Sequence, residues 1–188
     1  MRVAFIIFDG MTSLDLIGVY DPVTRLRTMG FMPDLEWEIC AYTKRVTDYA
    51  GLRYTPTKVG GSLANYDMVI VPGGFGTRKL IDDDEFIEWL RTATPCRFKV
   101  SVCTGSLLLG AAGFLKGKKA TTHRNEMNEL RKFCKDVVGD RVVDEGDVIT
   151  GRGVTSSIDL GLCICEKLSG AETRERIREQ MDYHPSAT

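Results

Sequence analysis

Long hydrophobic runs and blocks of basic residues are missing from this chain of 188 residues. No apolar stretch approaches the roughly 20 residues that a membrane-spanning helix requires, so we expect no membrane partner. The formal net charge is −1, and without a Lys/Arg block the chain offers no electrostatic footprint for nucleic acid. The first apolar run ends early, at Asp9-Gly10, which favours a first strand over a signal peptide.

Paired cysteines and abundant histidines are missing as well. The six cysteines include no Cys-x₂-Cys spacing, so a zinc site has little support and we expect no metal. Because the chain is too large to depend on disulfides and shows no export signal, we predict free thiols in a reducing cytoplasm. Only two histidines occur, His123 and His184, which limits the general bases available to a catalytic site.

The pattern of apolar residues predicts an α/β fold. Hydrophobic residues make up 43% of the chain and charged residues 27%, as in a globular domain. Short apolar runs alternate with helical segments, which indicates a mostly parallel sheet covered by helices on both faces. We expect one domain over residues 1–183 and a loose tail at 184–188. Strands are predicted at 2–8, 35–42, 68–71, 97–102, 120–122, 141–143 and 148–150, extended or hairpin structure at 52–59, and helices at 14–29, 84–92, after Cys103, and at 125–134, 154–168 and 171–181.

Cys103 follows a short β-branched strand and precedes an apolar run of good helix formers. A cysteine at such a junction lies in a sharp turn, the arrangement of a nucleophile elbow with Cys in place of Ser. The N–H groups and the positive dipole end of the following helix favour its thiolate, which is the nucleophilic form. The residues alone leave a second interpretation open, a buried structural thiol, because free cysteines are often buried.

Three segments occur in the order and spacing of the ThiJ/PfpI superfamily, which this chain resembles over nearly its whole length. They are Val69-Ile70-Val71-Pro72-Gly73-Gly74, Cys103-Thr104-Gly105 and Leu115-Lys116-Gly117-Lys118-Lys119-Ala120-Thr121-Thr122-His123. Within the superfamily the chain is similar to isocyanide hydratase and to the sensory domains of AraC-type regulators. That likeness rests on residues 14–18, 101–113 and 150–159. The resemblance implies a flavodoxin-like three-layer α/β/α sandwich with a mostly parallel central sheet.

The resemblance also implies a pair of catalytic groups. Cys103 is expected to be the nucleophile, and Asp15, from the first helix, the acid beside it. Like charges at close range resist joint ionisation, so one of the two groups must hold a proton. A protonated Asp15 is suited to donate a proton to the substrate and then to help activate water. By its position alone, Asp15 is better explained as a carboxylate favoured at a helix start.

The same resemblance assigns further residues to the site. The backbone N–H of Thr104, at the start of a helix, is expected to stabilise negative charge. The expected substrate and oxyanion pocket comprises Gly73, Gly74, His123, Gly153 and Val154. Glycines also serve tight turns, and His123 is equally well explained as a satisfied structural histidine. Arg152 departs from the hydratase pattern, which has glycines there, and is expected to admit a charged substrate, to exclude a bulky one, or to face solvent.

Two related activities lose their general base in this chain. Protease-like members of the superfamily carry a histidine after the nucleophile, where this chain has Thr104. The class I glutamine amidotransferase triad requires a late His-x-Glu, and neither histidine shows that pattern. Peptidase and glutamine amidotransferase activities are therefore not expected.

The function expected from the resemblance is a cysteine-dependent hydratase or hydrolase that acts on a small molecule, without metal or organic cofactor, as a homodimer. A second hypothesis is a ligand-sensing domain that does not bind DNA, since the chain ends soon after Met181. A third hypothesis is protection against aldehyde or redox stress through an oxidisable Cys103.

Overall fold

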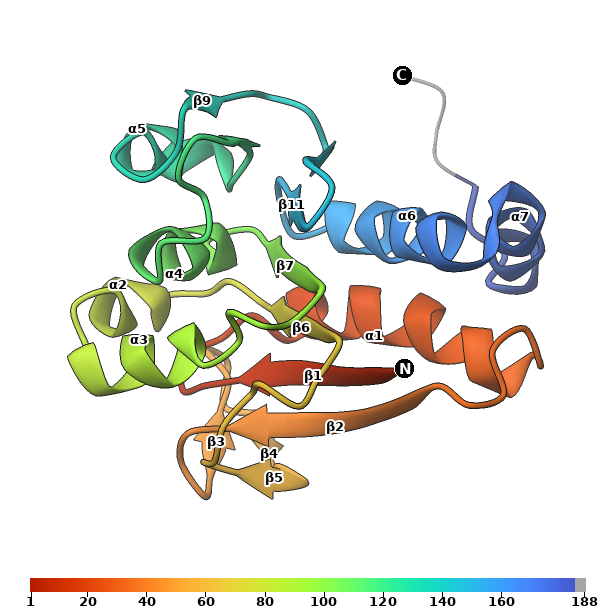
Figure 1. Ribbon diagram of the computed structural model, residues 1–188, viewed down its shortest axis with the longest axis horizontal. Helices are drawn as coiled ribbons and strands as arrows, with labels where there is room; N and C mark the ends of the chain where they lie inside the picture. The colour runs from red at the N-terminus through yellow and green to blue at the C-terminus, as the bar shows by residue number, and fades with distance from the viewer. Residues whose placement is uncertain (185–188) are drawn as a thin grey trace.

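The computed structural model of the chain describes residues 1–184, in which a seven-stranded sheet lies between two groups of helices (Figure 1). The expected tail at 184–188 therefore lies outside the described residues, except for His184. The strand order is β10-β11-β7-β6-β1-β2-β5, with bounds Val142–Asp144, Val148–Gly151, Phe98–Val102, Met68–Val71, Arg2–Ile7, Glu36–Ala41 and Lys58–Val59 in that order.

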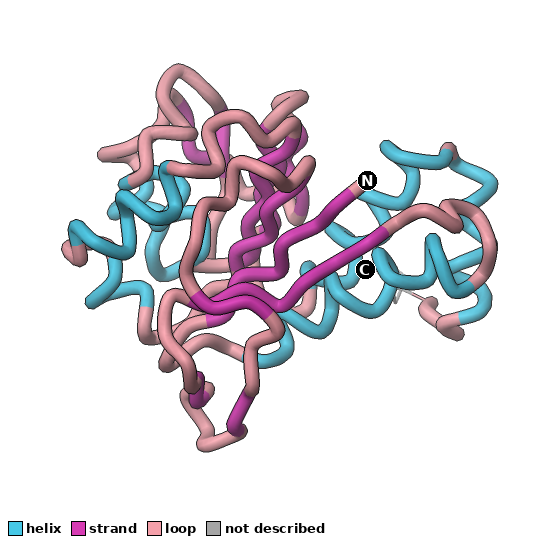
Figure 2. Tube along the Cα trace, turned by 60° about the horizontal axis from the view of Figure 1, so that its bottom comes forward, coloured by secondary structure: helices cyan, strands magenta, loops and turns pink. Residues whose placement is uncertain are grey.

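The helices form the two outer layers of a sandwich, which Figure 2 shows on either side of the strands. Helices α1, α6 and α7 pack together on one face, and the shorter helices lie on the other. The helices are α1 (Ser13–Thr28), α2 (Thr77–Leu80), α3 (Asp84–Arg91), α4 (Gly105–Ala111), the 3₁₀ helix η1 (Arg124–Glu126), α5 (Met127–Leu130), α6 (Ser156–Ser169) and α7 (Ala171–Gln180). In the part of the chain that the structure describes, no helix has the length and apolar character needed to cross a membrane.

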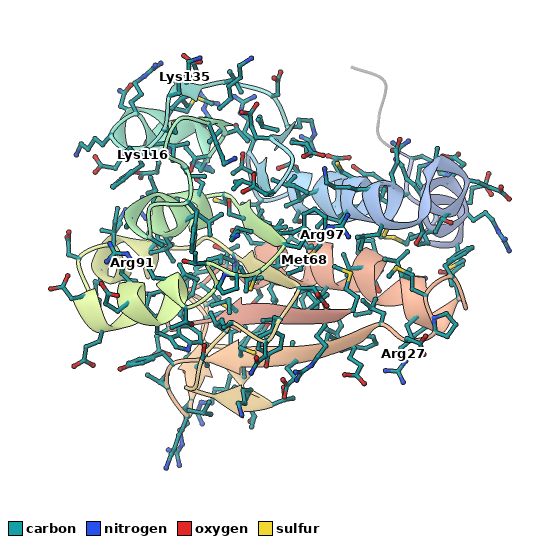
Figure 3. The ribbon with its side chains drawn as sticks, viewed as in Figure 1. Arg27, Met68, Arg91, Arg97, Lys116 and Lys135 are labelled. Atoms are coloured by element: carbon teal, nitrogen blue, oxygen red, sulfur yellow. The ribbon has the colours of Figure 1, made fainter. Side chains whose placement is uncertain are left out.

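The central strands are mostly apolar and are buried because helices cover both of their faces, although β7 also contains the buried Lys99 and Ser101. Every residue of β6 and β7 is buried, and so is every residue of β1 after Arg2. β1 pairs in parallel with β2 and β6, whereas only β10, at the edge, runs antiparallel to its neighbour β11 within this sheet. Figure 3 shows Met68 inside this core and Arg27, Lys116 and Lys135 on the outside. The predicted sandwich with a mostly parallel sheet is confirmed.

Parallel strands bring their carboxyl ends to one edge of the sheet, and the loops after β1 and β6 are joined there. The N–H of Thr12 donates to the carbonyl of Gly73 over 2.8 Å, and Met11 forms an isolated bridge with Gly74. A Cβ on Gly74 would collide with the backbone of Met11, so only glycine permits this approach. The first turn of α1 is thereby held beside the loop that follows β6.

Two local predictions needed correction. The helix expected at 125–134 is only the turn η1 followed by α5, which ends at Leu130; beyond it, Phe133 lies against Gly110 of α4. The strand expected at 120–122 is β8 (Lys119–Ala120), which pairs with β9 (Asp136–Val137) outside the main sheet. The extended or hairpin structure expected at 52–59 is confirmed: the segment contributes to a hairpin, β3 (Val46–Thr47) with β4 (Arg53–Tyr54), and to β5 at the sheet edge.

Helices α1 and α6 pack unusually closely because glycines lie at their contact. A Cβ on Gly18 of α1 would overlap the Ser157 hydroxyl, and a Cβ on Gly161 of α6 would overlap the ring of Pro22. The Ser157 hydroxyl is also 3.2 Å from the carbonyl of Leu14. This contact holds the first turn of α1 against α6, in addition to its contact with the loop after β6.

We expect Gly18→Ala to destabilise the protein by about 1–3 kcal/mol, the usual range for overpacking. The measurement is urea unfolding followed by circular dichroism. Gly139→Ala is the control, because no heavy atom lies within 4 Å of a Cβ built there. Equal midpoints for the two variants would contradict the close α1–α6 contact.

Candidate active site

Cys103 occupies a strained turn between β7 and α4. Its φ is 55°, and among the non-glycine residues of 1–184 only Asp182 shares a positive φ. Such a conformation costs roughly 1–3 kcal/mol and persists only where the surroundings hold it. The Cys103 N–H donates to the carbonyl of Gly151 over 2.8 Å, and its carbonyl accepts from the hydroxyls of Ser106 and Thr122, each at 3.0 Å. The predicted strand–turn–helix junction is present.

Asp15 lies in the first turn of α1 and is completely buried. Its Oδ2 accepts a hydrogen bond from the N–H of Gly73 at 3.0 Å, while Oδ1 has no hydrogen-bond partner within residues 1–184. Burial raises the pKa of Asp15 to about 7, and the Gly73 N–H and the neighbouring Cys103 thiol oppose that rise. Asp15 is therefore a carboxylic acid able to gain or lose a proton near neutral pH.

Burial and the charge of Asp15 together raise the pKa of Cys103 to about 12. The Thr104 N–H, at the start of α4, lowers this pKa, but its effect is smaller than that of burial. The helix start therefore favours the thiolate in the expected direction, but burial and the charge of Asp15 outweigh it. Asp15 and Cys103 instead form a coupled pair in which one group keeps a proton when the other is ionised.

Thr104 and the two glycines after β6 are bonded to one another. The Thr104 hydroxyl accepts from the N–H of Gly74 at 2.9 Å and lies 3.2 Å from the Gly74 carbonyl. A Cβ on Gly73 would come within 2.8 Å of the Cβ of Cys103. Because the two glycine N–H groups are already donated to Asp15 and Thr104, they position those residues. The expected oxyanion role of Gly73 and Gly74 needs free donors, which neither glycine provides here.

A cavity of about 570 Å³ opens above Cys103 and Thr104. Its wall is largely apolar, and several of its large side chains are exposed at the mouth. Its lining residues include Leu14, Tyr49, Leu52, Phe75, His123 and Val154. Gly153 is not among the lining residues; its N–H instead donates to the Ser156 hydroxyl at 2.8 Å.

His123 lines the cavity, as expected, but it also has a structural hydrogen bond. Its Nδ1 accepts from the N–H of Asn125 at 3.4 Å and so caps η1. Arg152 does not line the cavity: its guanidinium donates to the carbonyl of Gly139 at 2.9 Å. The cation of the cavity wall is Arg78, which pairs with Glu126 and lies over the ring of Phe75 at 5.1 Å.

Asp48, which sequence reasoning missed, joins the β3–β4 hairpin to Ser13 at the start of α1, beside the cavity. It accepts from the hydroxyl of Ser13 and from the N–H groups of Ala50 and Leu52, both at 2.8 Å. The Tyr54 hydroxyl donates to Ser13 Oγ over 2.7 Å. The Ser13 hydroxyl holds the pKa of Asp48 below its ordinary value. Asp48 lines the cavity and Asp15 is buried outside its lining, so the two carboxyl groups have opposite pKa shifts in different surroundings. In the sequence, the one signal for the role of Asp48 was the turn-forming stretch Asp48-Tyr49-Ala50-Gly51.

A cysteine in a strained elbow, beside a buried carboxylic acid at the carboxyl edge of a parallel sheet, defines a class of flavodoxin-like α/β proteins with a thiol at the sheet edge. Residues 1–167 match the model of the DJ-1/PfpI family, and the chain belongs to that family. The resemblance to the ThiJ/PfpI superfamily is thus confirmed.

Three relatives illustrate its range. The chain is 36% identical to isonitrile hydratase of Pseudomonas putida, over 99% of this chain and 80% of that protein. The crystal structure of a ThiJ/PfpI family protein from Pseudomonas syringae has a TM-score of 0.89 and 32% identity, covering 99% of this chain and 76% of that one. The HTH-type transcriptional regulator GbdR of Pseudomonas aeruginosa is 24% identical over 96% of this chain but only 50% of the regulator.

We expect Asp15→Asn to stabilise the protein at neutral and alkaline pH. The pKa of Asp15 is raised from its ordinary 3.8 to about 7, so the wild type loses stability as pH rises across that interval. The loss is at most about 4 kcal/mol, at roughly 1.36 kcal/mol for each pH unit. Urea unfolding at several pH values measures the difference from wild type, which should vanish below about pH 4.

Asp48→Asn is the matched comparison with the opposite sign. Because the pKa of Asp48 is lowered in the folded protein, its contribution to stability is present above its ordinary pKa and is lost in acid. This variant should therefore be less stable than wild type at neutral pH. A stability difference for Asp15→Asn that stays constant from pH 4 to pH 8 would show that Asp15 titrates normally.

Proposed function

We propose that this chain is a cysteine-dependent hydratase that converts isocyanides to N-substituted formamides. The observation that carries the proposal is the Asp15–Cys103 pair, buried under an apolar cavity and coupled through its protons. Similarity to isonitrile hydratase over 99% of the chain supports the same reaction, since isonitrile and isocyanide name one functional group. The reaction needs only water and the substrate, and no metal or organic cofactor is proposed.

The reaction begins when the sulfur of Cys103 bonds to the terminal carbon of the isocyanide. The single proton of the coupled pair moves to that carbon, which gives a thioimidate and leaves Asp15 as a carboxylate. The high pKa of the Cys103 thiol means that its proton must leave as the bond to carbon forms, through Asp15. The buried Oδ1, which has no partner within the described chain, is the oxygen suited to this transfer.

Hydrolysis then uses the same carboxylate. Asp15 takes a proton from water while the hydroxide bonds to the thioimidate carbon, and that proton passes to the substrate nitrogen. The carbon–sulfur bond breaks as the new hydroxyl becomes a carbonyl, and the hydroxyl proton returns to the pair. The product is the formamide, and Asp15 and Cys103 regain their starting protonation.

The walls of the cavity support an apolar group on the substrate nitrogen. Leu14, Tyr49, Leu52 and Phe75 line the cavity and leave much of their surface exposed at its mouth. Such a surface suits a small hydrocarbon or aryl group. The substrate proposed is thus a small apolar isocyanide, and neither nucleic acid nor membrane is a proposed partner.

A second copy of this chain is the proposed protein partner. At the cavity mouth, α1 exposes Leu14, the hairpin exposes Tyr49 and Leu52, and Phe75 is 66% exposed. Ile17, three residues after Leu14 in α1, is exposed as well. Contiguous exposed apolar side chains of this kind mark interaction surfaces. We place this homodimer in a reducing compartment, the cytoplasm, because all six cysteines are free thiols.

Ligand sensing is a second candidate function. It is favoured by the 96% of this chain that aligns with the regulator GbdR. A sensing domain would use the same cavity to bind a small molecule reversibly, without turnover. The two functions differ in one observable, because an enzyme forms product continuously whereas a sensor saturates.

We expect wild-type protein to hydrate a small aryl isocyanide and Cys103→Ala to abolish turnover. Asp15→Asn should slow it by about 10²- to 10⁴-fold, the usual contribution of a general acid–base group. Formamide formation measured by liquid chromatography tests both. Cys134→Ala is the control, since this half-buried thiol bonds only to backbone carbonyls and does not line the cavity.

Absence of both turnover and a Cys103 adduct would refute the hydratase. Saturable binding without product would then support sensing, and a gain of oxygen on Cys103 would support redox protection.

We expect Ile17→Glu to convert a dimer to a monomer, because a carboxylate placed in the apolar patch loses its hydration in the interface. Light scattering after gel filtration measures the mass. Arg27→Glu, at an exposed position near the other end of α1, is the control and should leave the dimer intact. A monomeric wild type would refute the homodimer.

A further inference from the structure

The carbonyl of Cys103 is held by two buried hydroxyls that the proposed mechanism does not use. The hydroxyls of Ser106 and Thr122 each lie 3.0 Å from it, and both side chains are completely buried. Ser106 belongs to the turn that Cys103 begins, so its contact is local. Thr122 reaches the same oxygen from the segment after β8, 19 residues along the chain.

The adjacent threonine provides a natural comparison. Thr121 is also completely buried, but its hydroxyl has no partner in the described part of the chain. Its N–H donates to the Thr150 hydroxyl at 3.0 Å, which ties this segment to β11. The two neighbouring threonines are thus alike in size and burial, but of the two only Thr122 donates its hydroxyl to the carbonyl of the candidate nucleophile, Cys103.

The peptide between Cys103 and Thr104 connects that contact to the sulfur. The Cys103 carbonyl and the Thr104 N–H belong to one planar unit and can only turn together. The Thr104 N–H acts on the Cys103 sulfur, where it stabilises negative charge. A hydrogen bond to the carbonyl both fixes the plane and polarises the N–H on its other side.

Strain at Cys103 makes this contact necessary. With φ at 55°, the residue tends to relax towards ordinary backbone geometry unless both of its peptide units are held. Gly151 holds the unit before Cys103, through the Cys103 N–H. The peptide unit after Cys103 is held at its carbonyl by two hydroxyls, that of Ser106 within the elbow and that of Thr122 from a distant segment of the chain.

We propose that Thr122 is a positioning residue, whose hydroxyl fixes the Cys103–Thr104 peptide so that the Thr104 N–H faces the sulfur as negative charge develops on it. The proposal rests on Cys103 being the nucleophile of the proposed function, and it does not depend on which electrophile Cys103 attacks. It predicts a lower intrinsic reactivity of the thiol when the hydroxyl is lost.

The test is alkylation of Cys103 by iodoacetamide across a range of pH, followed by mass spectrometry of the peptide that contains it. Thr122→Val should alkylate about five- to tenfold more slowly at neutral pH, the effect of one hydrogen bond, with its pH profile displaced to higher pH. Thr122→Ser, which keeps the hydroxyl, should restore the wild-type rate and profile.

Thr121→Val is the matched control and should alkylate like wild type, because the hydroxyl it removes has no partner in the described chain. If Thr122→Val alkylates at the wild-type rate, or if Thr121→Val is slowed equally, Thr122 has no positioning role. Should Thr122→Val fail to fold, Thr122→Ala compared with Thr121→Ala gives the same decision. Iodoacetamide reports on the thiol alone, so failure to hydrate isocyanides would refute the proposed function and leave this test standing.

Discussion

The strained backbone at Cys103 is the constraint on which the rest of the site depends. A residue other than glycine keeps a left-handed conformation only where moving its neighbours would cost more free energy than relief of the strain would release. Here those neighbours are the β11 carbonyl of Gly151, the hydroxyls of Ser106 and Thr122, and glycines that let the backbone after β6 come within contact distance. The parallel sheet supplies this arrangement because it brings its strand ends to one edge.

The same crowding that fixes the sulfur also removes water from it. Exclusion of water raises the pKa of both Asp15 and Cys103. The protonation state of each group then also depends on the charge and hydrogen bonding of the other. A thiol held protonated is a poor nucleophile until a base takes its proton. The protonation of Cys103 therefore depends on the Asp15 carboxyl, and the two groups have to be considered together.

Much of the fold follows from local sequence. Apolar runs such as residues 68–71 and 98–102 read as buried parallel strands, and the elbow at Cys103 follows from the strand that ends there. Asp15 was found through the family resemblance, because a helix-start carboxylate carries no mark of the thiol it meets. What local sequence did not contain was the direction of side chains and N–H groups across long separations.

Arg152 illustrates this limit, because its guanidinium bonds to the carbonyl of Gly139 and the arginine that lines the cavity is Arg78. The N–H groups of Gly73 and Gly74 illustrate it too, because their acceptors come from α1 and from the elbow. The thiolate expected from the helix start was outweighed by burial, which no window of sequence around Cys103 measures.

The β3–β4 hairpin stands apart from this crowded edge. The hairpin is held beside the cavity by the hydrogen bonds of Asp48 and a few backbone contacts. Around Cys103, by contrast, the backbone is so closely packed that a Cβ added at Gly73 or Gly74 would collide with its neighbours. In the proposed function, the reacting thiol and the residues that select the substrate therefore lie in different stretches of chain under unequal constraint. Under that proposal, replacement of Tyr49 or Leu52 would change which substrates enter the cavity and leave the elbow intact, so substrate preference is free to diverge while the thiol site is kept.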